Sequence, residues 1–161
     1  DFTSNIDSTY DSYVFKFINI HPATDNVNFT FNMSVDGGSN YNVTKTTTFF
    51  TALHNEADSE AFITYASGED LAQSTAFQQL SPNSGNGADE NISGTLTLFN
   101  PSSTTFVKHF ITNFNSGTYH DFNRNDFVAG YGNTTSAINA VQFKMSSGNI
   151  DDGVIKLYGI S

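Results

Sequence analysis

The sequence predicts an all-β domain, an antiparallel β-sandwich of jelly-roll type, from three observations. Apolar and polar residues alternate over many short runs, which is the period of strands with one buried face. The chain contains 16 Phe and 7 Tyr but no Trp, and Phe and Tyr favour strands. Gly, Asn and Asp gather between the runs, where turns need them. At 161 residues, one domain covering residues 1–161 is expected.

The clearest strand covers residues 27–35. Val, Phe, Phe, Met and Val occupy one of its faces, and Asn, Thr, Asn and Ser occupy the other. We therefore expect the first face in a core and the second in water. A turn at residues 36–38 follows. About seven further strands with hairpin spacing are predicted at residues 13–20, 41–50, 94–99, 104–114, 126–131, 138–145 and 154–160.

Residues 52–91 break this rhythm as a long excursion of loop and short helix. Residues 56–65 fit either a short helix or a long loop, and residues 81–87 have the composition of a flexible tip. Loops this long in compact domains tend to be functional or mobile. The chain ends on the strand at residues 154–160, which we expect to pair inside its sheet.

The charge balance excludes two classes of partner. Six Lys and Arg against sixteen Asp and Glu give a formal net charge of −10. So few cations cannot neutralise a row of phosphates, which argues against nucleic acid and against an anionic membrane surface. The absence of Cys removes disulfides, thiolate nucleophiles and Cys-based metal sites. Because the chain opens at Asp1 without Met, we expect either processing or further residues upstream.

No catalytic or metal-binding signature emerges. The four histidines are scattered, and His109 is interpreted as a surface or packed residue. Residues 121–126 alternate oxygen-bearing side chains as a calcium loop does, but the Gly at its sixth position and the Glu at its twelfth are missing. The acids gather in loops, whereas glycoside hydrolysis needs two that are held rigidly. We therefore predict no enzyme activity, no metal and no cofactor.

A binding surface is the remaining candidate. Residues 113–123 mix aromatic rings with amide and hydroxyl groups, as sugar sites and protein interfaces do. The alternative interpretation is an ordinary loop anchored by Phe and Tyr. The ligand-binding residues that the mixture predicts are Tyr119, His120, Asp121 and Asn123.

Several segments resemble a family of small structural proteins from tailed bacteriophages of aquatic bacteria. They are YVFKFINIHP at residues 13–22, FNPSST at 99–104, SSGNI at 146–150 and KLYG at 156–159. The resemblance covers nearly the whole chain, and the two C-terminal pieces are its most specific part. It implies a virion component with a jelly-roll-like sandwich and an extra N-terminal strand ahead of Asp1. It carries over no catalytic motif.

We therefore expect a non-enzymatic structural protein at the particle surface of a virion, foremost a capsid decoration protein. Its expected partners are other virion proteins and further copies of the chain, with a trimer preferred from virion symmetry. The alternative is a carbohydrate-binding module on a tail fibre or spike that recognises host surface glycans, because sandwiches are a common lectin scaffold. A third hypothesis, a depolymerase of surface polysaccharide, lacks an identifiable pair of acids.

Overall fold

The computed structural model describes residues 1–161 and contains ten strands and no helix. All pairings between neighbouring strands are antiparallel, which confirms the predicted all-β antiparallel architecture. The strands are β1 (Ser12–Pro22), β2 (Val27–Ser34), β3 (Lys45–Asn55), β4 (Ala61–Tyr65), β5 (Gln78–Ser84), β6 (Ile92–Phe99), β7 (Lys108–Gly117), β8 (Phe122–Gly132), β9 (Ala140–Met145) and β10 (Ile150–Ile160).

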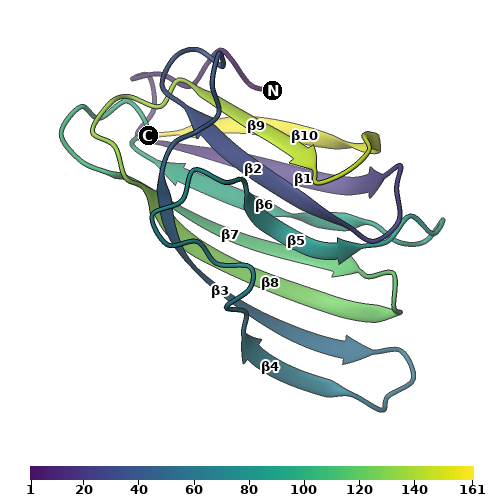
Figure 1. Ribbon diagram of the computed structural model, residues 1–161. Helices are drawn as coiled ribbons and strands as arrows, with labels where there is room; N and C mark the ends of the chain where they lie inside the picture. Colours follow the sequence, from purple (N-terminus) through teal and green to yellow (C-terminus); the bar gives the residue numbers. More distant parts are fainter.

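The strands form two sheets of very different width. The large sheet has the order β10-β1-β6-β7-β8-β3-β4, and the small sheet has the order β5-β2-β9. Figure 1 shows the small sheet lying over the part of the large sheet around β1, β6 and β7, with β3 and β4 extending beyond it. The predicted β-sandwich is confirmed. The jelly-roll arrangement is not confirmed: the sheets hold seven and three strands, whereas a jelly roll has eight strands arranged in two Greek keys.

The core between the sheets is built from aromatic rings. Phe143 of the small sheet meets Phe15 and Phe17 of β1 edge to face, with ring centroids 5.0 and 4.8 Å apart. Phe31 of β2 meets Phe110 of β7 in the same way at 4.8 Å. Edge-to-face contacts are the favoured geometry of aromatic pairs and add to the gain from burial. The high Phe content is therefore explained by the filling of one inter-sheet layer.

The strand β2 is buried on both faces, so the expectation that its polar face is in water is wrong. Asn32 is fully buried. Its amide nitrogen donates to the carbonyls of Tyr41 (2.7 Å) and Thr75 (3.0 Å), and its amide oxygen accepts from the ammonium of Lys45 at 2.6 Å. The loops before β3 and before β5 thus cover the outer face of the small sheet. Polar residues alternate here because they bond these loops, not because they are solvated.

The excursion at residues 52–91 also differs from its prediction. Its first part is a hairpin of β3 and β4, joined by a turn at residues 56–60, and neither a helix nor one long loop forms. The proposed flexible tip at residues 81–87 begins inside β5, where Ser81 and Ser84 are buried. Apart from that turn, the connecting segments are residues 66–77 and 85–91, and the first of these pairs with β3 through a bridge between Lys45 and Ser74.

Two connections that look like hairpins in the sequence cross between the sheets instead. The turn at residues 36–38 leads from β2 in the small sheet to β3 in the large one. The connector with Gly148 likewise leads from β9 to β10. The last strand does pair, but only with β1, and it forms one edge of the large sheet.

Two substitutions in β2 test its burial on both faces. We expect Phe31→Ala to lower the free energy of unfolding by about 3–5 kcal/mol, as truncations of core aromatics do. Asn32→Ala should cost about 1–3 kcal/mol, because it leaves two buried carbonyls without a donor and removes one of the two acceptors of the Lys45 ammonium. Urea unfolding of each variant measures these losses.

The control is Asn113→Ala, the same truncation at an exposed position of β7. It should change the free energy of unfolding by no more than about 0.5 kcal/mol. An Asn32 variant as stable as this control would contradict the two-sided burial of β2.

Candidate functional site

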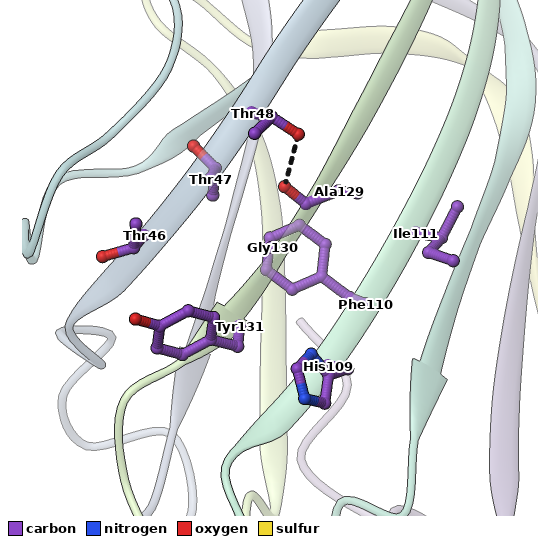
Figure 2. Close-up of a pocket in the computed structure, with 9 residues that line it drawn as sticks. All are labelled: Thr46, Thr47, Thr48, His109, Phe110, Ile111, Ala129, Gly130 and Tyr131. Atoms are coloured by element: carbon purple, nitrogen blue, oxygen red, sulfur yellow. Dashed lines mark hydrogen bonds between the residues drawn. The ribbon is translucent and has the colours of Figure 1, made fainter.

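The outer face of the large sheet, which the small sheet does not cover, carries a hollow of about 410 Å³. Figure 2 shows its walls: threonines of β3 on one side, His109 and Ile111 of β7 on the other, and small residues of β8 between them. Ala129 lies between Thr48 and Ile111 in the strand register, so a methyl group forms the floor. The rings of His109 and Tyr131 meet edge to face at 5.9 Å and close one end.

An aromatic row lies beside this hollow on the same face. Tyr65 of β4, Phe50 of β3 and Phe127 of β8 are direct cross-strand neighbours. The rings of Phe50 and Phe127 are parallel, with an interplanar angle of 9° and centroids 4.8 Å apart. That separation equals the spacing of strands in a sheet, so the two rings stand upright with their faces against each other. They present their edges to solvent as an apolar ridge and do not offer a flat platform for a ligand to stack on.

The ridge continues to an uncovered sheet edge at β4. All five residues of β4 are exposed, and the sequence there, AFITY, has no charge. Ile63 on the outer face is 76% exposed, and Phe62 on the inner face is 46% exposed because the small sheet does not reach it. No strand pairs with the far side of β4. Acidic residues flank the strand in the adjoining turns, at Glu56, Asp58, Glu60, Glu69 and Asp70.

Of the four residues predicted to bind a ligand, Tyr119, His120 and Asp121 lie in the β7–β8 turn and Asn123 lies at the start of β8, at the opposite end of those strands from the hollow. The rings of Tyr119 and His120 lie 3.7 Å apart between centroids. The amide oxygen of Asn123 accepts from Asn115 at 2.7 Å, and Asp121 adopts a positive φ of 58° in the turn. None of the four lines a surface hollow. The structure therefore brings them together in one turn but forms no cavity around them.

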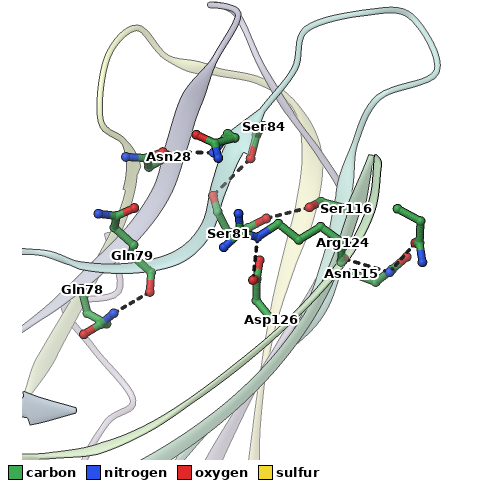
Figure 3. Close-up of polar contacts among 11 residues, drawn as sticks. Asn28, Gln78, Gln79, Ser81, Ser84, Asn115, Ser116, Arg124 and Asp126 are labelled. Carbon is green, nitrogen blue, oxygen red and sulfur yellow. Dashed lines mark hydrogen bonds and ion pairs between the residues drawn. The ribbon is translucent and has the colours of Figure 1, made fainter. Parts of the chain in front are cut away.

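A buried polar cluster fastens β5 of the small sheet to β7 and β8 (Figure 3). The hydroxyl of Ser81 donates to that of Ser116 at 2.9 Å. Beside them, the guanidinium of Arg124 donates to the carboxylate of Asp126 at 2.7 Å. The second oxygen of Asp126 is buried without a partner, and burial raises the pKa of this carboxyl to about 6 despite Arg124. This cluster is closed to solvent and acts in stability.

A second, polar hollow of about 530 Å³ lies where β1 ends and β10 begins. His21 places Nδ1 2.7 Å from the carboxylate of Asp151 and Nε2 3.1 Å from the carbonyl of Gly87. The hydrogen bond to Asp151 is the main cause of a raised His21 pKa. Because both ring nitrogens are engaged, this imidazole has no free nitrogen with which to act as a general base. The pair instead ties the segment before β6 to the β1–β10 edge.

No group of three or more His, Asp or Glu side chains comes close enough to hold a metal ion. His54 lies in an exposed contact with Asp58 at 3.0 Å, and His109, expected to be either a surface or a packed residue, is exposed. There is no helix that could span a membrane. Searches of protein-family models, curated proteins and solved structures found no match to this chain.

Sequence reasoning overlooked the hollow and the β4 edge. The hollow had a signal, since Phe127, Ala129 and Tyr131 are apolar on the face of β8 opposite to the core residue Val128. A strand that is apolar on both faces is either buried twice or has an open apolar face. The five residues of β4 were too few to separate from a loop by periodicity alone.

The buried carboxyl of Asp126 should make stability depend on pH. Its pKa of about 6 in the folded protein is above the value of 3.8 expected when unfolded. Between those values the folded state binds more protons, so the free energy of unfolding should fall as pH rises from about 4 to 6. Arg124 and Glu69 are the charged groups that act on it, in opposite directions.

Urea unfolding of the wild type and of Asp126→Asn across this pH range measures the effect. The variant should show a clearly smaller fall, because Asn carries no titrating proton. An identical pH dependence in the two proteins would show that Asp126 ionises in the folded state as it does in the unfolded state.

Proposed function

We propose that this protein is a non-enzymatic structural protein on the exterior of a virion, foremost a decoration protein of the capsid. The observation that carries the proposal is the uncovered apolar end of the large sheet. Soluble monomers rarely expose a large contiguous apolar patch, and an unprotected edge strand invites pairing. Such a surface suits a protein whose working state is an assembly. The exposed apolar side chains there are Phe50, Phe62, Ile63 and Tyr65.

The charge distribution supports a place at a particle surface. Lys45, Lys108 and Arg124 are buried, so half of the six cations are withdrawn from the surface. The exposed surface is therefore more acidic than the net charge of −10 suggests. A strongly negative exterior keeps particles soluble and apart from one another.

The segments that resemble phage structural proteins are neighbours in the fold. Residues 13–22 lie in β1 and residues 156–159 in β10, and these strands pair directly, with Val14 opposite Tyr158. Residues 99–104 follow the β6 end that pairs with Ser12. The fourth segment, residues 146–150, is the connection that leads into β10. The four segments are thus contiguous around one part of the large sheet, which supports the use of the resemblance in proposing a virion component.

Imaging of the intact particle by electron cryo-microscopy tests this proposal. We expect the fold to fit density on the outer surface of the head, in copies that follow the capsid symmetry. Particles that lack this chain should keep the shell but lose that outer density. Density found only on the tail, or none on the particle, would contradict a role in capsid decoration.

A carbohydrate-binding module of a fibre or spike is the second candidate, and the hollow on the outer face favours it. The hollow combines the ring of Tyr131 with the hydroxyls of Thr46 and Thr48 and the imidazole of His109. Sugar sites use such combinations of an aromatic surface with a few polar groups. The predicted Tyr119 turn provides an independent location for the same activity.

A glycan array separates the two locations. If the hollow binds host glycans, Tyr131→Ala should lower the affinity at least about tenfold, the usual range for an anchoring aromatic residue, while Tyr119→Ala binds as the wild type does. The reverse result would place the site in the β7–β8 turn. No saturable binding by the wild-type protein would exclude this candidate function.

A further inference from the structure

The large sheet ends in two strands that each have one unpaired side. At one end β4 pairs only with β3, and at the other end β10 pairs only with β1. The free side of each strand exposes backbone N–H and C=O groups that a further strand can bond. β10 is eleven residues long, so it offers more than enough length to cover the five residues of β4.

Both edges are apolar on the outer face of the sheet. Ile63 and Tyr65 project from that face on β4, and Val154 and Tyr158 project from it on β10, each about half exposed or more. Placed side by side, the two strands would bury these side chains as cross-strand neighbours. Such pairs are the unit by which strands stabilise each other in a sheet.

The two edges differ in charge. From Gly153 to Ile160 the only charged side chain of β10 is Lys156, whereas Asp151 and Asp152 lie at the start of the strand. Only three cations are exposed, and two of them, Lys16 of β1 and Lys156 of β10, are direct cross-strand neighbours. The ammonium of Lys16 also lies over the ring of Tyr158 at 5.6 Å from its centroid. Around β4, by contrast, the acidic residues of the turns at 56–60 and 69–70 lie on both sides of an uncharged strand.

These charges decide which edge strand of a second copy can pair with β4. Two β4 strands meeting antiparallel would bring the acidic turn at 56–60 of one copy beside Glu69 and Asp70 of the other. Like charges facing each other across an interface disfavour that pairing. An antiparallel β10 strand that pairs through its residues 156–160 instead brings Lys156 beside Tyr65 and the following acids, and it leaves Asp151 and Asp152 beyond the five residues of β4. In this register β4 is matched to β10 and not to itself.

We propose that copies of this chain join edge to edge, with the β10 edge of one copy docked on the β4 edge of the next. This inference rests on the proposed function, in which the chain assembles with itself on a particle. Because every copy has one edge of each kind, the contact is head to tail. Contacts of this type close into a ring when the rotation allows and otherwise extend as an open chain.

The test measures the mass of the purified protein by light scattering over a range of concentrations. The wild type should form oligomers whose fraction grows with concentration and declines with added salt, because an attraction between exposed charges is screened. Ile63→Lys on β4 and Lys156→Glu on β10 should each weaken self-association at least about tenfold, since one places a charge on an apolar edge strand and the other reverses the attracting charge.

Two matched controls make the same changes away from the edges. Phe106→Lys alters an exposed residue of the segment between β6 and β7, and Lys144→Glu alters an exposed residue of the small sheet. Both should associate as the wild type does. Near-ultraviolet circular dichroism confirms that each variant is folded, and Tyr65→Lys replaces Ile63→Lys if the latter unfolds.

Mixing the two edge variants gives the sharpest result. The Ile63 variant keeps an intact β10 edge and the Lys156 variant keeps an intact β4 edge, so the mixture should form a dimer of one copy of each and nothing larger. A monomeric wild type, a Lys156 variant that still self-associates, or controls that dissociate would each overturn the inference.

The edge contact and the proposed virion role can fail independently of each other. A wild type that stays monomeric in solution, while density for the chain is found on the head, overturns the edge contact alone. Edge-to-edge assembly of a protein that is absent from particles overturns the virion role alone.

Discussion

A three-stranded sheet cannot cover a seven-stranded one, and most features of this protein depend on that mismatch. Strands lie about 4.8 Å apart, so the small sheet spans less than half the width of the large one. Under the small sheet the inter-sheet layer is dry and filled by Phe. Beyond it, toward β8 and β3, the same layer turns polar, with Thr51, Arg124 and Asp126, and at β4 no cover remains. Across the large sheet, an apolar core under the small sheet is thus followed by a polar region at β8 and β3 and then by the uncovered edge at β4.

The small sheet in turn depends on loops that replace a third layer. With only three strands, β2 has a neighbour on each side, but its outer face would be open without residues 35–44 and 66–77. Asn32 bonds both loops through their backbone carbonyls and holds the ammonium of Lys45. Lys45 is fully buried, and this burial lowers the pKa of its ammonium to about 7. A buried cation is stable here because amide and carbonyl oxygens surround it.

Alternation predicted the strands well and their partners poorly. It located most of the ten strands because a buried face every second residue is a local property. It could not assign β2 and β3 to different sheets, since that depends on contacts far apart in the sequence. It also could not tell the solvated Asn113 from the buried Asn32, because both alternate with apolar residues. Among candidate sites, composition found the turn at Tyr119, whereas the hollow and the β4 edge arise from cross-strand registers that no local pattern contains.

The open apolar end raises the question of how the protein avoids indiscriminate aggregation, and the charges give an answer. An apolar strand flanked by acids on both sides repels any second acidic surface, and nearly the whole exterior of this chain is acidic. Burying Lys45, Lys108 and Arg124 removes most alternative attractions. Specificity then comes as much from what is repelled as from what is attracted. The pair Lys16 and Lys156 is the only place where two exposed cations adjoin in one sheet, so the same acidity that disfavours random contacts leaves one preferred approach.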